Sequence, residues 1–349
     1  MAPLIKLDFV TLDVFTDSPF LGNPLAVVLV PAHHRAALGQ ETKQRIAREF
    51  NLSETVFLHV PDKDDQGNLV QASTTREIDI FTIDLELPFA GHPTIGTAHF
   101  VLNGLRWLSV DTLHTRAGPI RITATPSDDN AEGGESRVRA QIPHDVHVHG
   151  QTLGDIWARD PASLEKLMGT FLSDDLAIRN AELAGTPVSI VRGMTFLLVE
   201  LPSIDHLGLV SPSKGFDLST VPGLLDNGPW GAGFLSRYYY VRVPQSNLAE
   251  GGAASRSALA VRARMVELGF EDPATGSAAC TLASYLAMQD KPDAGVLRLE
   301  IAQGVEMGRR SDISVDVTGV RSASGDEFLI KDVFLGGTAA MVMSGTISV

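Results

Sequence analysis

The chain has 349 residues, enough for two ordinary domains, and its 44% hydrophobic and 20% charged residues are typical of a globular protein. The formal net charge of −14 repels polyanions and argues against nucleic acid as a partner. A single cysteine, Cys280, excludes an intrachain disulfide and suits a reducing compartment. No apolar run approaches the roughly 20 residues of a membrane span, and the N-terminus lacks a signal-peptide core. We therefore expect a soluble, cytoplasmic protein that binds neither nucleic acid nor membrane.

The first half of the chain has the pattern of short strands with two helices among them. Strand character is found at 9–15, 24–30, 55–58, 75–87, 109–115 and 120–124. One helix is predicted over 40–50, where Ile46, Ala47 and Phe50 share a face, and another over roughly 93–102. Residues 62–68 predict a polar turn. The Asp-, Gly- and Ser-rich segment 126–135 predicts a loop at a domain crossing.

The second half again consists mostly of predicted strands, at 138–142, 187–191, 195–201, 238–243, 296–301, 313–317, 328–335 and 339–347. The first of these is expected to open the second domain. Asp160 and Pro161 have the pattern of a helix start, and the face of that helix would be Leu164, Leu167, Met168 and Phe171. A helix over roughly 273–288 follows a predicted mobile loop at 246–257. Many short strands with few helices favour an α+β fold over a regular βαβ series.

Two predicted helix starts carry the same pattern in the two halves. His-Pro-x-x-Gly-Thr-Ala begins at His92 and Asp-Pro-x-x-Gly-Ser-Ala begins at Asp272, an offset of 272 − 92 = 180 residues. Asp272 is predicted to cap its helix, with Pro273 as the first helical residue. Small residues at each start leave the first N–H groups open to a carboxylate or phosphate. The repeat predicts a duplicated architecture with one site between its halves.

Three ionisable residues are candidates for chemistry, and each has a structural alternative. Asp272 is either a helix cap or an acid/base carboxylate beside an anion-binding helix end. His92 occupies the matching position in the other half, where an imidazole can transfer a proton near neutral pH, although a lone histidine is more often structural. Glu54 is either a solvated turn residue or a partly buried carboxyl with a raised pKa.

Other chemical signals are weak or missing. Residues 276–279 lack the second glycine of Gly-x-Ser-x-Gly, so a hydrolase elbow is not supported. The chain has no Gly-x-Gly-x-x-Gly after a strand and no Walker-type loop, so no motif supports nucleotide binding. His144, His147 and His149 lack the spaced cysteine or carboxylate partners of a metal site, and we predict a solvated strand edge without a metal. Cys280 is expected to pack in the core as a small apolar residue.

Six motifs in a fixed order connect the chain to a known family. They are DVFTD at 13–17, GNPLAVV at 22–28, FNLSET at 50–55, PFAGHPT at 88–94, EDPATGSAA at 271–279 and QGVEMGR at 303–309. In these motifs the chain resembles the PhzF-like family, which is named for a phenazine-biosynthesis isomerase and shares the diaminopimelate epimerase fold. The motifs span most of the chain.

The resemblance implies an α+β fold of two similar domains related by a pseudo-two-fold axis. Each would be a strongly curled, mostly antiparallel sheet around a central helix, with the active site in the cleft between the domains. We place the first domain at 1–127 together with the C-terminal strand 337–349, and the second at 128–336.

The resemblance also implies proton transfer at carbon without a cofactor, as in isomerases and epimerases. Glu54 would be the principal general acid/base, with His92 and Asp272 lining the site. A substrate carboxylate would bind the helix start at Gly276 and Ser277. The predicted substrate-binding residues are Asn23, Gly91, Gly276 and Ser277.

Two departures from the family pattern limit what can be carried over. Extra length at 126–135, 150–172 and 246–257 would reshape the cleft, so the substrate of the founding enzyme is not transferred. Diaminopimelate and proline epimerases use two opposed cysteines, and the single Cys280 excludes that mechanism. We expect an isomerase acting on a small carboxylic acid, with a homodimer as the family-level expectation. The alternatives are a non-catalytic binding or interaction protein on the same fold, and a lyase or tautomerase using the same residues.

Overall fold

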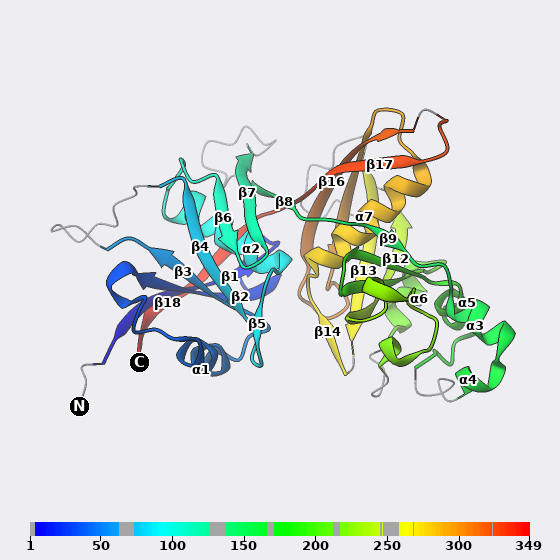
Figure 1. Cartoon of the computed structure of the whole chain (residues 1–349), viewed down its shortest axis with the longest axis horizontal. Coiled ribbons are helices and arrows are strands. Elements are labelled where there is room, and N and C mark those ends of the chain that lie inside the picture. The colour runs from blue at the N-terminus through cyan, green and yellow to red at the C-terminus, as the bar shows by residue number, and fades with distance from the viewer. Residues whose placement is uncertain are drawn as a thin grey trace. The chain divides into compact units, whose positions relative to one another are not determined.

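The computed structural model describes residues 4–62, 73–125, 137–165, 171–211, 217–244, 246, 258–267, 269–322 and 324–349. The predicted loop at 126–135 lies outside these residues, as do most of the turn at 62–68 and of the loop at 246–257. The chain divides into two compact units (Figure 1): unit 1 is Met1–Gln141 with Leu335–Val349, and unit 2 is Ile142–Phe334. Each unit combines short strands with a few helices, which confirms the α+β class.

Unit 1 is built on a sheet in which the first and last described strands are neighbours. β1 (Lys6–Val14) pairs antiparallel with β2 (Asn23–Pro31) on one side and with β18 (Ala339–Ser348) on the other. β2 lies parallel to β3 (Thr55–Val60), which pairs antiparallel with β4 (Thr75–Phe81). The other strands that begin in this unit are β5 (Glu86–Leu87), β6 (Thr112–Thr115), β7 (Gly118–Thr125) and β8 (Arg137–Ile142).

Helix α2 (Gly91–His99) is the central helix of unit 1. All of its residues are buried, and it contacts β1, β2, β3, β7 and β18. Gly96 permits this close approach, because a Cβ there would lie 2.6 Å from Leu25 Cδ2 and 2.7 Å from Val14 Cγ2. The chain continues from α2 into a π-helical segment, η2 (Phe100–Gly104). The helix predicted at 93–102 therefore exists but spans two helical segments.

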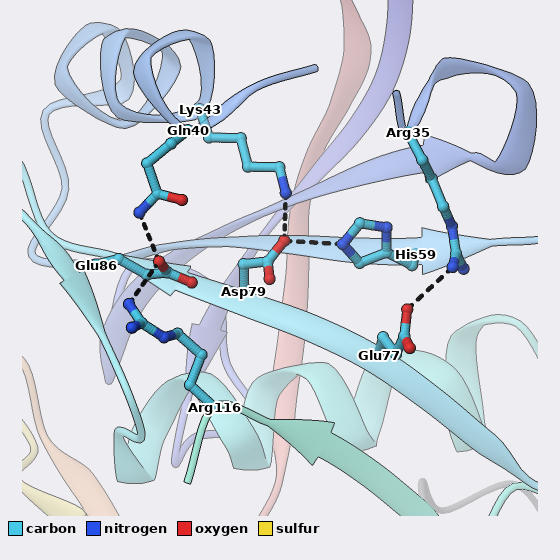
Figure 2. Close-up of polar contacts among 8 residues, drawn as sticks. All are labelled: Arg35, Gln40, Lys43, His59, Glu77, Asp79, Glu86 and Arg116. Carbon is cyan, nitrogen blue, oxygen red and sulfur yellow. Dashed lines mark hydrogen bonds and ion pairs between the residues drawn. The ribbon is translucent and has the colours of Figure 1, made fainter. Parts of the chain in front are cut away.

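Polar contacts fix helix α1 (Gln40–Phe50) against β3 and β4, and this helix leads into Glu54. Lys43 Nζ and His59 Nε2 contact the same atom, Asp79 Oδ2, at 2.5 and 2.8 Å (Figure 2). Burial opposes the charge of Asp79, but the hydrogen bonds from His59 and Lys43 outweigh it and hold the pKa of Asp79 below its ordinary value. The contacts give α1, and the segment that follows it, a fixed place on the sheet.

The strand predicted at 138–142 exists. As β8 it pairs antiparallel with β7 of unit 1, with Ala140 opposite Ile122. Alternating burial identifies a strand, but its partner depends on residues elsewhere in the chain. The compact units are divided after Gln141 and after Phe334, whereas the sequence-based boundaries lie after 127 and 336.

Unit 2 contains a second sheet, with both parallel and antiparallel strand pairs. Its strands are β9 (His147–Val148), β10 (Thr186–Val191), β11 (Met194–Glu200), β12 (Phe234–Val243), β13 (Leu259–Glu267), β14 (Phe270–Asp272), β15 (Val296–Gln303), β16 (Ser311–Arg321) and β17 (Phe328–Gly337), the last of which leads back to unit 1. β9 to β14 are neighbours in chain order. β13 also pairs parallel with β15, which pairs antiparallel with β16.

Helix α7 (Gly276–Asp290) is the central helix of unit 2, where it contacts β10, β11, β15 and β16. It begins three residues later than the sequence pattern predicts. Asp272 is not its cap: it ends β14, opposite Met265 in β13, and Thr275 is the N-cap residue. Pairing with β13 holds Asp272 in a strand, which overrides the local preference of Asp-Pro for a helix start. His92, by contrast, is the second residue of α2.

The remaining helices of unit 2 are short: α3 (Leu153–Arg159), α4 (Pro161–Glu165), α5 (Leu176–Ala184), α6 (Ile204–Leu209), and the 3₁₀ turns η3 (Leu218–Thr220) and η4 (Gly228–Trp230). The helix predicted around 160–171 is described only as α4, and Phe171 lies outside it in the apolar core. Helices α3, α5 and α6 were missed, although Thr152, Asp175 and Ser203 cap them with side-chain hydrogen bonds. No helix in the described ranges is long and apolar enough to cross a membrane.

The short turn before α1 completes unit 1 as the 3₁₀ segment η1 (Ala32–His34). It follows β2 directly and precedes α1 in the chain.

Candidate active site

Glu54 lies where the chain passes from α1 into the buried strand β3. Helix α1 ends at Asn51, whose φ of 52° places it in the left-handed region that commonly stops a helix. The Glu54 side chain is 17% exposed, and its Oε2 atom lies 3.5 Å from Nε2 of His92. The structure therefore brings two predicted acid/base residues together in unit 1.

Asn23 holds His92 from the other side of the ring. Asn23, the first residue of β2, is buried, and its Nδ2 atom lies 3.4 Å from His92 Nδ1. An amide NH₂ group only donates, so Nδ1 accepts and the neutral ring carries its proton on Nε2, toward Glu54. We call Asn23, His92 and Glu54 the acid/base cluster.

Burial changes the chemistry of Glu54. It raises the pKa of the carboxyl above its ordinary value, and a hydrogen bond from the Ser53 side chain opposes that shift only in part. Glu54 Oε2 is buried and forms no hydrogen bond with the described residues. Glu54 is thus not a solvated turn residue. A carboxyl with a raised pKa exchanges its proton closer to neutral pH, as a general acid/base requires.

Three of the predicted binding residues lie at helix starts. Gly91 is the first residue of α2, and Gly276 and Ser277 are the first two of α7. The first N–H groups of an α-helix have no partner within the helix, and they lie at the positive end of its dipole. In α7 the first bond back into the helix start runs from Ala279 N to Thr275 O at 3.0 Å. Binding of a carboxylate at Gly276 and Ser277 stays a prediction.

Asp272 belongs to a hydrogen-bonded network in unit 2. Thr275 Oγ1 donates to Asp272 Oδ2 at 2.5 Å. The fully buried Gln303 donates from Nε2 to the Asp272 carbonyl at 2.9 Å. Gln303 Oε1 accepts from Thr275 N at 3.2 Å and from the Tyr238 hydroxyl at 3.0 Å. We call Asp272, Thr275, Gln303 and Tyr238 the Asp272 network.

Sequence reasoning did not identify three members of this network. Gln303 begins the QGVEMGR motif, so the resemblance marked its position but not its hydrogen bonds. The next residue, Gly304, has a φ of 72°, and a Cβ there would lie 2.7 Å from the carbonyl oxygen of Pro273. This glycine lets the turn after Gln303 pack directly against the segment that follows Asp272. Tyr238 carried no signal beyond its place in a predicted strand.

Cys280 lies inside α7 and is fully buried, which confirms the prediction that it packs in the core. Burial raises the pKa of its thiol. A thiol with a raised pKa stays protonated near neutral pH and is a poor nucleophile or base. Cys280 is therefore not a candidate proton carrier.

Comparisons with known proteins agree with the fold and the motifs. The family model for phenazine biosynthesis-like proteins matches residues 12–172 and 249–345. An uncharacterized isomerase of Mesorhizobium japonicum is 31% identical over 324 residues, which cover 89% of this chain and 90% of the relative. The trans-2,3-dihydro-3-hydroxyanthranilate isomerase of Pseudomonas aeruginosa is 31% identical over 309 residues, 87% of each protein.

Among solved structures, the PhzF-family phenazine biosynthesis protein of Bacillus anthracis aligns over 98% of this chain and 99% of its own, with a TM-score of 0.66 and 19% identity. That likeness concerns the fold, which is the α+β fold of the diaminopimelate epimerase type. Fold and relatives together define an isomerase. The chain belongs to the phenazine biosynthesis-like family.

Proposed function

We propose that this isomerase moves a proton between carbon atoms of a small carboxylic acid without a cofactor, and that Glu54 is its general acid/base. The observation that carries the proposal is the buried Glu54 carboxyl, whose pKa is raised and whose Oε2 atom lies 3.5 Å from His92 Nε2. A solvated glutamate would have neither property.

In the proposed step, the Glu54 carboxylate removes a proton from one carbon of the substrate. The protonated carboxyl then returns a proton to another carbon, so that the substrate is isomerised and the enzyme is restored. His92, oriented by Asn23, places Nε2 3.5 Å from Glu54 Oε2, where its N–H would stabilise the charged form of the carboxyl during the reaction. Proton return from Glu54 makes an external cofactor unnecessary.

The groups of unit 2 have a binding and positioning role in this proposal. The first N–H groups of α7, at Gly276 and Ser277, would hold the substrate carboxylate. Asp272, fixed by Thr275 and Gln303, would contact the substrate close to that carboxylate. A single site that uses groups of both units remains the sequence-based hypothesis, and so do the homodimer and the small carboxylate as partners.

Deuterium exchange tests the proposal. The compound named for the P. aeruginosa relative, trans-2,3-dihydro-3-hydroxyanthranilate, heads a panel of small cyclic and amino acids incubated with the enzyme in D₂O. We expect NMR to show deuterium at carbon in at least one of them. Glu54→Gln should slow this exchange about 10²- to 10⁴-fold, the usual contribution of a general acid/base.

Glu49→Gln is the matched control, because it makes the same change at an exposed glutamate of α1. It should exchange at the wild-type rate. Full exchange by Glu54→Gln would remove Glu54 from the mechanism. Exchange by no enzyme with any compound of the panel would favour the alternative of a non-catalytic binding protein.

A further inference from the structure

Two histidines and one aspartate lie together in unit 2, outside the acid/base cluster and the Asp272 network. His147 is in β9, His149 follows that strand, and Asp226 precedes η4. One possible ligand atom from each lies within 4.8 Å of the others. His147 Nε2 lies 2.8 Å from Asp226 Oδ2, and His149 Nδ1 lies 3.9 Å from the same oxygen. We call these three residues the histidine–aspartate cluster.

The hydrogen bonds of His149 fix its proton on the nitrogen that faces away from the cluster. Its Nδ1 atom accepts from the backbone N–H of Asp226 at 2.9 Å, so Nδ1 carries no proton. Its Nε2–H donates to Ser189 Oγ at 2.9 Å, and that hydroxyl contacts Thr195 Oγ1 at 2.7 Å. The Nδ1 lone pair is directed at the Asp226 backbone N–H, and Nδ1 lies 3.9 Å from the Asp226 carboxylate.

The other two residues are oriented as well. The His147 ring stacks on Trp230, with 4.6 Å between ring centroids and 10° between planes. Asp226 Oδ2 lies 2.8 Å from His147 Nε2, and its Oδ1 accepts from the Gly150 backbone N–H at 3.4 Å. The side chains of His147 and Asp226 remain 30% and 39% exposed, so an ion can reach them from solvent.

We propose that the histidine–aspartate cluster binds a transition-metal ion of the zinc class through His147 Nε2, His149 Nδ1 and Asp226 Oδ2. Zinc lies about 2.0–2.2 Å from nitrogen and oxygen ligands, which places tetrahedral ligands about 3.3 Å apart. The observed separations of 2.8 and 3.9 Å lie on either side of that value. Two imidazoles with one carboxylate suit zinc better than calcium or magnesium, which prefer oxygen ligands.

Binding of the ion breaks one hydrogen bond of the histidine–aspartate cluster. The ion replaces the Asp226 N–H as the partner of His149 Nδ1, and it displaces the proton between His147 and Asp226. The hydrogen bond from His149 Nε2 to Ser189 is of the kind that orients histidine ligands in metal sites. Water takes the fourth position. The three histidines at 144–149 gave no metal signal in the sequence because their carboxylate partner lies 77 residues beyond His149.

The ion is assigned a structural role. In the order of strand pairing, β10, β11, β12 and β13 separate β9 from β14, which carries Asp272. A metal at the cluster would join β9 to the segment before η4 and would take no part in the isomerase step. Loss of this site therefore leaves the proposed proton transfer unchanged, so the two proposals can fail separately.

Zinc titration tests the site on tag-free protein that has been stripped with a chelator and dialysed. Calorimetry should give one zinc per chain, and the fluorescence of Trp230 should change over the same titration because this ring stacks on a ligand. His147→Ala and Asp226→Asn should each weaken binding on the order of 10- to 100-fold or more, since even the partners of metal ligands matter to that extent. Asp226→Asn keeps the shape of the side chain and removes its charge.

His144→Ala is the matched control, because His144 lies in the same segment but contacts the Ile142 carbonyl instead of the cluster. It should bind zinc like the wild type, and zinc should raise the Tm of both but not that of His147→Ala. His33→Ala tests the exposed His33–Asp62 pair as another zinc ligand. Absence of binding in the wild type, binding unchanged in His147→Ala and Asp226→Asn, or loss of binding in His33→Ala alone would each overturn the proposal.

Discussion

The acid/base cluster of unit 1 and the Asp272 network of unit 2 hold their carboxylates in different ways. Glu54 faces His92 at 3.5 Å, and its Oε2 atom forms no hydrogen bond among the described residues. Asp272 is held by a 2.5 Å hydrogen bond from Thr275 and, through its carbonyl, by Gln303. Burial with few hydrogen bonds raises the pKa of a carboxyl, as at Glu54, whereas several hydrogen bonds hold a carboxylate group in one orientation. This difference is the basis on which we propose proton transfer in unit 1 and positioning in unit 2.

The two central helices, α2 and α7, start at different points of the same repeated sequence pattern. The 180-residue offset places Gly96 in α2 against Gly276 in α7, but α7 starts at that glycine and α2 starts five residues before its own. His92 is consequently inside a helix, where its ring can reach Glu54. Asp272 is in a strand, where β13 and Gln303 hold its backbone.

After Glu54→Gln, the largest expected effect comes from the unit 1 side of the comparison. His92→Gln removes the imidazole that faces Glu54, and we expect kcat to fall about 100-fold, at the lower end of acid/base contributions. Steady-state kinetics on a substrate found by deuterium exchange gives the measurement. His114→Gln makes the same change at an exposed histidine of β6 and should leave kcat unchanged. A His92→Gln enzyme with wild-type kcat would contradict the role of the cluster.

A smaller effect on rate but a clear loss of stability is expected on the unit 2 side. Gln303→Leu leaves the Thr275 N–H, the Tyr238 hydroxyl and the Asp272 carbonyl without a buried partner, which costs about 3 kcal/mol of unfolding free energy. Urea denaturation measures the loss, and Gln289→Leu, at an exposed position of α7, serves as the control. In the surviving folded enzyme KM should rise more than kcat falls. A fall in kcat equal to that of His92→Gln, with stability unchanged, would make the network catalytic.

The smallest expected effect is a gain in stability when Glu54 becomes glutamine. The pKa of Glu54 is higher in the folded than in the unfolded chain, so the folded state loses stability as pH rises from the unfolded pKa through the folded pKa. Glu54→Gln removes that loss. Its Tm should therefore exceed that of the wild type at pH 8 and match it near pH 4, where Glu54 is protonated in both states.

Thermal scans of a control variant across this pH range test whether the gain in Tm is specific to Glu54. The control Glu49→Gln should show no such pH-dependent gain, because its side chain is exposed. A wild-type Tm that stays below that of Glu54→Gln by the same amount at pH 4 would show that the gain has another cause than the charge of Glu54.

Local patterns predicted part of this fold because their causes are local. The helix predicted at 40–50 is α1 at both ends, since its apolar face and the stop at Asn51 both lie within one segment. The predicted strands correspond to β1, β2 and most of those that follow for the same reason. The cap predicted at Asp272 was wrong because β13 pairs with that residue, and a propensity of about 1 kcal/mol does not resist strand pairing.

The candidate site was harder to predict from local patterns, because its contacts join residues that lie far apart in the chain. The family motifs indicated Glu54, His92 and Asn23, and the structure shows that these residues meet. The contacts of Gln303 with Asp272 and of Asp226 with His149 join residues 31 and 77 positions apart, and no local spacing reports them. The burial that raises the pKa of Glu54 likewise comes from packing around the end of α1, which a turn sequence of Asn-Leu-Ser-Glu does not reveal.

Because β18 pairs with β1, the sheet of unit 1 cannot be completed until the end of the chain has been synthesised. β1 acquires its second neighbour only when residues 339–348 emerge, after the whole of unit 2 has been synthesised. Until then one edge of β1 offers unpaired N–H and C=O groups to other chains. The hydrogen bond from the Ala339 N–H to Nδ1 of His99 in α2 also forms only after residue 339 has been synthesised. The unit that begins first, and that carries Glu54, therefore completes its sheet only with the last strand of the chain.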